Sequence, residues 1–274
     1  MSNRDILMLN DFFIKHPVFT LDEFKTFHVA EDNRYSRTAE AALAYYCKSG
    51  KLQRLRRGLY AVITTSVNSA ERFVPDSFLI ASRMSKDAVL VHHTALEFHG
   101  RAYSVFNRFT YQTAFANKEF TFHNYQFKAI SVPAPLRKVE QANFGVISTE
   151  HKGLEVKVTS LERTMVDVFN RSVYSGSWEE IWRSLESVEF FDLDLVLEYV
   201  KLLDNSTTTA CVGFFLEQNK DRLLVDDKYL DALRKLRPKQ PHYFDSRQKK
   251  GKLLKDLNLL VPEEILNKSW DETL

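Results

Sequence analysis

The stretch that most constrains this fold runs from residue 34 to residue 62, RYSRTAEAALAYYCKSGKLQRLRRGLYAV, and is typical of a helix followed directly by a short basic hairpin. The helix would turn Arg37, Ala41, Ala44 and Lys48 to one side, which is then both positively charged and thin. Such a face can approach the floor of a DNA groove while its charged ends contact phosphates. The opposite side has the spacing of an apolar stripe, made of Ala39, Ala42, Leu43, Tyr46 and Cys47.

The hairpin is expected to be short and basic. Gly50 can end the helix in a left-handed conformation, and four cations follow between Lys51 and Arg57. Arg57-Gly58 can form the turn between strands over residues 52–56 and 59–63. Three arginines would project from this hairpin toward the DNA strand that flanks the groove: Arg54, Arg56 and Arg57.

Two more helices are expected before this stretch. Apolar residues repeat at helical spacing up to the His16-Pro17 pair, which should end the first helix. Thr20-Leu-Asp-Glu23 has the spacing of a capping box and predicts the start of the second helix. Either Ser36 or Thr38 can cap the third. Three helices and a hairpin within residues 1–66 predict a winged helix-turn-helix DNA-binding domain.

Length and composition constrain the number of domains, the distribution of charge and the cellular compartment. A chain of 274 residues with 44% hydrophobic residues is long enough for two domains. Its net charge of only +2 means that a DNA-binding surface must be a local patch. The two cysteines, Cys47 and Cys211, exclude a disulfide framework and favour a reducing cytoplasm. We expect a cytoplasmic protein without a membrane span, because no run of 18 apolar residues occurs.

Residues 67–274 are expected to form a larger second domain. It should be rich in strands over 88–158, with candidates at 108–113, 120–132, 144–148 and 154–158 and a turn at 123–124. It should then be helical over 160–274, with candidates at 161–170, 178–188, 193–203, 209–220 and 228–236. Earlier helices are predicted at 73–82 and, from the capping-box spacing of Thr94 and Glu97, up to Gly100. The fold class is therefore α+β: a winged helix-turn-helix followed by a larger mixed domain with a β-rich first part and a helical C-terminal part.

Charge is strongly segregated along this second part. Residues 176–198 hold seven acidic groups against one arginine, whereas residues 228–255 hold ten lysines and arginines against two aspartates. The basic region ends in Arg247-Gln-Lys-Lys-Gly-Lys252 and could bind RNA, DNA or an acidic protein. A solvated basic segment that neutralises the acidic helices is an equally good interpretation, and the sequence leaves both open.

Metal and nuclease chemistry are disfavoured by the residues themselves. His92, His93 and His99 lack a nearby cysteine or aspartate to complete a zinc ligand set, and the last two are six residues apart. Glu155-Val-Lys157 resembles half of a metal-dependent nuclease site, but no aspartate lies between Asp87 and Asp167 to hold the metal. An ordinary alternating strand explains this triplet better.

Transferase and hydrolase motifs are also missing. Gly176-Ser177 followed by Asp192-Leu-Asp194 faintly resembles a nucleotidyltransferase site, but these aspartates open a predicted helix, where they favour the positive end of its dipole. No P-loop, G-x-S-x-G or H-E-x-x-H motif occurs. We therefore expect no enzyme, no catalytic residue, no metal and no cofactor. A nuclease or transferase remains the third hypothesis, and calorimetry with magnesium and manganese would test it.

The segment Ser160-Leu-Glu-Arg-Thr164 has a simple structural interpretation. Ser160 can cap a helix, and Arg163 can pair with Asp167 at i, i+4 on the helix surface. These roles explain the residues structurally, without a direct part in function.

Four segments in order, GKLQRLRRGLY, HHTALEFHG, VTSLERTMVDVFNR and GSWEEIWRSL, resemble the AbiEi-type antitoxins and related bacterial transcriptional regulators. The resemblance covers residues 35 to 186. It implies a type IV toxin-antitoxin system of abortive infection, a class of phage defence. The antitoxin would repress its own operon at inverted repeats and oppose a nucleotidyltransferase toxin with its C-terminal domain, without a stable toxin-antitoxin complex.

The resemblance also implies which residues act. Antitoxicity would fall beyond residue 68, with Lys249, Lys250 and Lys252 as weak candidates. A monomer that binds the two repeats cooperatively is expected, although dimers can fill inverted repeats too. The candidate DNA-binding residues are Arg34, Ser36, Arg37, Thr38, Lys48, Lys51, Arg54, Arg56 and Arg57.

The alternative is a stand-alone winged-helix regulator whose C-terminal domain binds a ligand or a protein. A nucleotidyltransferase gene next to this one would favour the antitoxin.

Overall fold

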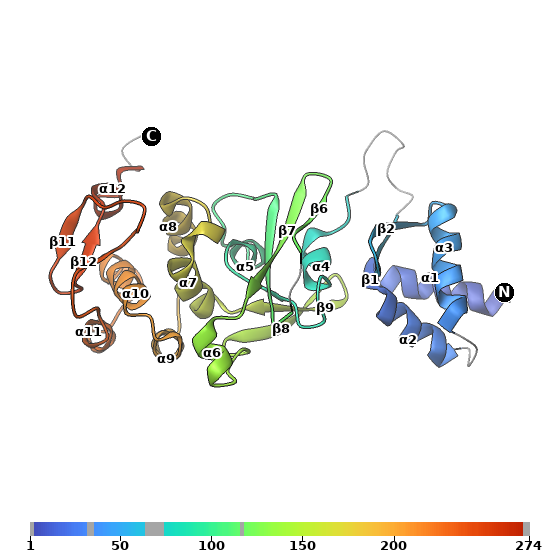
Figure 1. Ribbon diagram of the computed structural model, residues 1–274, viewed down its shortest axis with the longest axis horizontal. Helices are drawn as coiled ribbons and strands as arrows, with labels where there is room; N and C mark the ends of the chain where they lie inside the picture. Colours follow the sequence, from blue (N-terminus) through green and yellow to red (C-terminus); the bar gives the residue numbers. More distant parts are fainter. Residues whose placement is uncertain (1–2, 32–35, 64–73, 116–117, 271–274) are drawn as a thin grey trace.

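The computed structural model describes residues 3–31, 36–63, 74–115 and 118–270. Figure 1 shows three parts along the long axis: a small unit of helices and strands, a larger sheet with helices, and a helical part that ends in a small sheet. The described parts mix helices and strands throughout, which confirms the α+β class. None of the described helices is long and apolar enough to cross a lipid bilayer.

The N-terminal unit has three helices and a three-stranded sheet. Its strands are antiparallel in the order β1-β3-β2. This arrangement is consistent with the expected winged helix-turn-helix, although β1 was not anticipated because three residues carry too little periodicity. The elements are α1 (Asn3–Lys15), β1 (Val18–Thr20), α2 (Leu21–Glu31), α3 (Ser36–Lys48), β2 (Leu52–Arg56) and β3 (Leu59–Val62).

Local signals explain why this unit forms. The predicted capping box is present at the start of α2, where Glu23 Oε2 accepts from the Thr20 amide at 2.6 Å and Thr20 Oγ1 accepts from the Glu23 amide at 3.2 Å. Aromatic rings fill the core, with Phe12 edge-on to Phe19 and to Phe24 at ring distances of 5.2 and 5.5 Å. The core therefore joins α1 to the start of α2 and the sheet.

A six-stranded sheet forms the middle of the molecule, and we call it the middle sheet. Its order is β6-β7-β5-β4-β9-β8, with β5 parallel to β7 and β4 parallel to β9. The strand candidate over 120–132 is divided into a hairpin at the expected turn, where His123 has a positive φ of 52°. The elements of this part are α4 (Ser77–Ser82), β4 (Val89–Leu90), α5 (His93–Phe98), β5 (Arg108–Thr113), β6 (Phe120–Phe122), β7 (Tyr125–Ser131), α6 (Ala134–Lys138), β8 (Val146–His151) and β9 (Leu154–Thr159).

The C-terminal part starts with the predicted helices. They enclose a core around the fully buried Trp182, Tyr199 and Phe215. Figure 1 shows α7 and α8 between the middle sheet and the last helices. The elements are α7 (Leu161–Asn170), a 3-10 turn η1 (Ser172–Tyr174), α8 (Trp178–Glu186), α9 (Leu193–Leu203), α10 (Ser206–Gln218) and α11 (Asp227–Lys235).

The expectation of a helical chain over the whole of 160–274 is wrong after α11. A second small sheet follows, made of β10 (His242–Tyr243), β11 (Lys252–Leu254) and β12 (Leu259–Val261), before α12 (Glu263–Leu266). Strands of two or three residues are too short to show an alternating pattern in the sequence. The turn into β11 needs Gly251, because a Cβ there would lie 2.3 Å from the Val261 carbonyl oxygen.

The N-terminal unit packs against the middle sheet. Leu55 and Leu59 of the hairpin lie in the same buried cluster as Leu79 and Ile80 of α4. The hairpin is therefore part of a junction and not a free projection. The domain boundary expected at residue 66 falls within residues 64–73, outside the described residues, and stays a prediction.

Candidate nucleic-acid interface

Helix α3 has the two faces that the sequence predicts. Ala39, Leu43 and Tyr46 are buried in the core of the N-terminal unit, while Ala42 and Cys47 are half-buried against it. The outer face is exposed at spacings i, i+3, i+4 and i+7, through Ala41, Ala44, Tyr45 and Lys48. Small side chains at its centre allow close approach of the helix backbone to a groove.

Tyr45 is a member of this face that the sequence analysis missed. Its side chain is 65% exposed, although the neighbouring Tyr46 is buried. The signal was its position, four residues after Ala41 and three before Lys48, which places it on the cationic side. An exposed aromatic beside a lysine suits contact with sugar or base edges.

Lys51 and Arg54 extend the positive charge from α3 onto the hairpin. Lys51 Nζ lies 5.7 Å from the centre of the Tyr46 ring. Arg54 is exposed and pairs in register with Tyr60 of β3. Burial raises the pKa of the half-buried Cys47 thiol and the charge of Arg54 lowers it, which places Arg54 beside the end of α3. We call Ala41, Ala44, Tyr45, Lys48, Lys51 and Arg54 the α3 face.

The first turn of α3 carries the other helix candidates. Ser36, Arg37 and Thr38 lie at the start of the helix, but their side chains lie outside the described residues, as does the whole of Arg34. Their proposed contacts with DNA stay predictions.

Arg56 does not project from the hairpin as the sequence suggested, and this expectation is wrong. Its guanidinium donates from Nη2 to the Met84 carbonyl oxygen of the middle part at 2.5 Å. The cause is a β-bulge: Arg54 pairs with Tyr60 and Arg56 with Leu59, so Leu55 is an extra residue between them. The bulge places Leu55 in the buried cluster between the hairpin and α4. It also directs the Arg56 side chain toward the middle part of the molecule.

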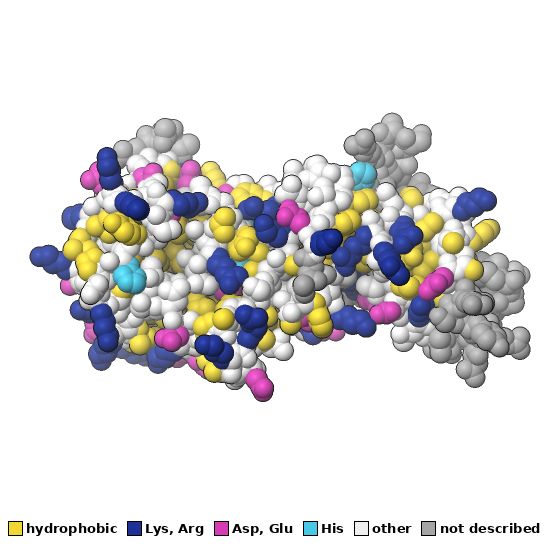
Figure 2. Space-filling model, in the orientation of Figure 1, with side chains coloured by type: hydrophobic (Ala, Val, Ile, Leu, Met, Phe, Trp, Pro, Cys, Tyr) yellow, Lys and Arg dark blue, Asp and Glu magenta, His cyan; other side chains and the backbone are white. Residues whose placement is uncertain are grey.

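Arg57 stands in the hairpin turn before Gly58, whose φ of +78° favours glycine. Its side chain is exposed and lines a groove of about 1190 Å³ between the N-terminal unit and the middle sheet, which we call the junction groove. Figure 2 shows Lys and Arg side chains gathered on the N-terminal unit and where it meets the middle part. Between described residues, two ion pairs cross the junction, Arg83 with Glu23 at 3.4 Å and Lys86 with Asp22 at 3.1 Å.

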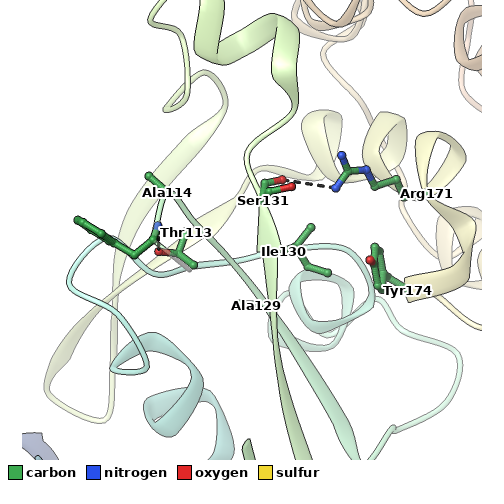
Figure 3. Close-up of a pocket in the computed structure, with 8 residues that line it drawn as sticks. Thr113, Ala114, Ala129, Ile130, Ser131, Arg171 and Tyr174 are labelled. Atoms are coloured by element: carbon green, nitrogen blue, oxygen red, sulfur yellow. Dashed lines mark hydrogen bonds between the residues drawn. The ribbon is translucent and has the colours of Figure 1, made fainter. Parts of the chain in front are cut away.

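A smaller pocket of about 410 Å³ lies where the parallel strands β5 and β7 end. Figure 3 shows Arg171 and Tyr174, from the segment after α7, beside Ile130 and Ser131 of β7. Arg171 donates to the Ser131 carbonyl oxygen at 3.4 Å. One cation, one phenol and strand-end hydroxyls could hold a small polar ligand.

The three histidines do not converge on one point. Burial lowers the pKa of His92 to about 4, and its ring lies 5.2 Å from Tyr174. His93 lies between two carboxylates, 2.9 Å from Glu97 and 3.1 Å from Glu180. His99 Nε2 lies 2.8 Å from the Thr159 carbonyl oxygen. Among the described residues, no three histidine, cysteine or acidic side chains form a group suited to a metal ion.

Arg163 and Asp167 pair as predicted, but not on the surface. Arg163 is 0% exposed and Asp167 3%, and their closest atoms, Nε and Oδ2, are 3.3 Å apart. Arg163 also donates to the Ala142 and Phe144 carbonyl oxygens and to Gln112, and Tyr199 donates to Asp167 at 2.7 Å. The pair therefore ties α7 to the middle sheet and α9.

Ser160 caps α7 as expected, because its Oγ accepts from the Arg163 amide at 3.3 Å.

Two other sequence patterns have structural roles. The Asp192 carboxylate caps α9 by accepting from the amides of Asp194 and Leu195, at 3.0 and 3.3 Å. Glu155 of β9 accepts from Ser148 of β8 at 2.8 Å across the hairpin. Both observations support the readings preferred from the sequence.

The C-terminal basic region is exposed around β11. Lys249, Lys250 and Lys252 make no ion pair with any described residue, whereas Arg247 is bound to Asp245 at 2.7 Å. The hydrogen bond from the Arg247 side chain lowers the pKa of Asp245 to about 2. The three lysines are thus free to meet an acidic partner, and their part in antitoxicity stays a prediction.

Comparison with known proteins supports the resemblance inferred from the sequence. Residues 8–63 match a family described as transcriptional regulator, AbiEi antitoxin. This match covers the N-terminal unit, including the segment GKLQRLRRGLY up to Tyr60, and the other three segments lie outside it. No protein of curated function matches the sequence.

The fold of the whole chain has a relative among solved structures. It is similar to the crystal structure of the RV2827C protein from Mycobacterium tuberculosis, with a TM-score of 0.60 and 13% sequence identity. The similarity covers 97% of this chain and 94% of that one. The two chains therefore share an architecture from end to end.

Proposed function

We propose, from the match of residues 8–63 to AbiEi antitoxin regulators, that this chain is the antitoxin of a type IV toxin-antitoxin system and represses its own operon. The observation that carries the proposal is the α3 face, where Ala41, Ala44 and Tyr45 are exposed together and are followed by three exposed cations. A thin, positive helix face of this kind fits the major groove of duplex DNA.

The contacts divide into two classes. Lys48, Lys51 and Arg54 bind phosphates and set the position of the helix, together with Arg57 at the hairpin turn. Arg34, Ser36, Arg37 and Thr38 at the start of α3 contact base edges or the adjoining phosphates. Arg56 has no part in this set because it binds the middle part of the chain. Affinity should fall steeply with salt, because each neutralised phosphate releases counterions.

Antitoxin activity is assigned to the chain beyond the N-terminal unit. The proposed target is the effect of a nucleotidyltransferase toxin, without a stable complex between the two proteins. The unpaired Lys249, Lys250 and Lys252 support an acidic partner at the C-terminal end. The protein is proposed to bind as a monomer, with cooperation between copies on the inverted repeats.

A gel-shift titration on the upstream repeats tests the DNA-binding surface. The double variant Lys48→Glu, Arg54→Glu should bind at least about tenfold more weakly and lose about two units of salt slope, since two phosphate contacts become repulsive. Lys138→Glu, an exposed change on α6, is the matched control and should bind normally. If the double variant binds as tightly as the control, the α3 face is not the DNA-binding surface.

Antitoxicity needs a separate test. Co-expression with the adjacent gene product should arrest growth, and the full chain should restore it. The triple variant of Lys249, Lys250 and Lys252 to glutamate should repress normally but restore growth poorly. Equal rescue by the variant and the parent would remove these lysines from the proposal.

A stand-alone regulator is the second candidate. The pocket of about 410 Å³ at the ends of β5 and β7 favours it, because that pocket offers a ligand site remote from α3. The absence of a toxin gene beside this one, with normal operator binding, would favour this candidate over the antitoxin.

A further inference from the structure

We propose that the junction groove binds a nucleotide, with the phosphates at its cationic wall and the base at its aromatic side chains. At about 1190 Å³ the groove is larger than the roughly 300–1000 Å³ of ordinary small-molecule sites. The proposal goes beyond DNA binding by the α3 face and does not depend on it.

The cationic wall comes from both sides of the junction. Arg56 and Arg57 line it from the hairpin, and Arg83, Lys86 and Lys157 line it from the middle part. Only Arg83 and Lys86 of these five lie within ion-pair distance of a carboxylate among the described residues. The wall therefore keeps positive charge that no carboxylate of the described chain balances.

The acidic side chains in the groove are already engaged. Asp22 pairs with Lys86 at 3.1 Å, and Glu155 accepts from Ser148 at 2.8 Å. Glu23 Oε2 accepts the hydrogen bond from the Thr20 amide in the capping box at the start of α2. Five lysines and arginines therefore line the groove against these three carboxylates, and the excess positive charge can bind an added anion.

Two guanidinium groups form the centre of the site. The Arg83 side chain is only 8% exposed. Among the described residues its hydrogen bond goes to Ser82 Oγ at 2.9 Å, and the 3.4 Å approach of its Nε to Glu23 is not a hydrogen bond. Within the part of the chain that the structure describes, Arg56 makes one hydrogen bond, to the Met84 carbonyl oxygen, and its buried Nε has no hydrogen-bond partner. A guanidinium has five N–H donors, so both groups keep free donors.

These donors suit phosphate. Planar guanidinium groups bind phosphate oxygens through two parallel hydrogen bonds, and such charge-assisted bonds are roughly twice as strong as neutral ones. Arg56 meets the middle part at Met84, the residue after Arg83, so the two groups approach the groove from neighbouring points. The proposal places a di- or triphosphate between these two groups, in the groove that Lys157 also lines.

Aromatic side chains also line the groove. Phe12, His16 and Phe27 line it, with ring distances of 4.1 Å from Phe12 to His16 and 4.7 Å from Phe12 to Phe27. His16 and Phe27 are half-buried, so their ring surfaces are accessible from the groove. A nucleobase stacks on such rings whatever its identity. The combination favours a nucleotide over inorganic phosphate.

Calorimetric titration of the full chain with ATP, GTP and inorganic pyrophosphate tests the site. We expect one nucleotide per chain, weaker binding of pyrophosphate, and weaker binding of all three at high salt. Lys157→Glu should weaken all three probes at least about tenfold, since an exposed cation becomes an anion. Phe27→Ala should weaken the nucleotides and leave pyrophosphate unchanged. Arg137→Gln, an exposed arginine on α6, is the control and should bind as the parent does.

Arg83→Gln should abolish binding of all three probes. Because Arg83 is buried, its variant is compared with the exposed Lys157→Glu, which should keep the parental melting temperature. Absence of heat with all three probes at millimolar concentration overturns the proposal. So does unchanged binding in Lys157→Glu. Binding of a short random duplex that Lys157→Glu abolishes, with no binding of nucleotides, would show that the groove takes DNA phosphates instead and would also overturn it.

Discussion

Removing Asp167 should destabilise this protein far more than removing Glu179, although each is the acidic member of an arginine pair at i, i+4. Asp167 is buried, and its loss leaves the Arg163 charge inside the protein with only uncharged acceptors among the described residues. Breaking a buried pair in this way costs about 3–5 kcal/mol. The Glu179 side chain is 40% exposed, and exposed pairs of this spacing contribute only about 0.3–0.5 kcal/mol.

Urea unfolding followed by tryptophan fluorescence measures the difference. Trp178 and Trp182 lie on α8 and pack in the same core as α7, so they report on this region. With an m-value of about 2–3 kcal/mol/M, Asp167→Ala should lower the urea midpoint by roughly 1–2.5 M. Glu179→Ala should shift it by a few tenths at most. Equal midpoints for the two variants would refute the argument that burial of the Arg163 pair sets its contribution.

Two further predictions concern pH and a close approach of backbone. The pKa of His92 is lowered to about 4 in the folded protein, against about 6.5 in the unfolded chain. The unfolded chain therefore binds more protons between these two pH values. As a result, the stability of the fold decreases as the pH falls from about 6.5 to about 4. The loss should reach up to about 3 kcal/mol and shrink in His92→Phe; an identical pH profile in that variant contradicts the assignment. Gly251→Ala should cost about 1–3 kcal/mol, because its Cβ would lie 2.3 Å from the Val261 carbonyl oxygen, and an unchanged melting temperature would show that the turn simply moves aside.

The sequence by itself determined the local features of this protein. The two faces of α3, the Thr20 capping box and the Ser160 cap each depend on residues of one short segment, so periodicity and side-chain chemistry suffice to predict them. The family match over residues 8–63 agrees with the segment recognised there. The predicted helix cap at Thr94 is wrong. Helix α5 begins at His93, and the Thr94 hydroxyl lies 3.3 Å from the hydroxyl of Thr110 on β5.

Only the tertiary structure decided where the charged groups point. Nothing near Arg56 in the sequence shows that a bulge at Leu55 turns it toward Met84, or that Arg163 and Asp167 lie beneath α9. The groove that Arg83 shares with the hairpin joins residues more than twenty positions apart. Burial depends on what packs across an element from elsewhere in the chain, and periodicity within one segment carries no information about that partner.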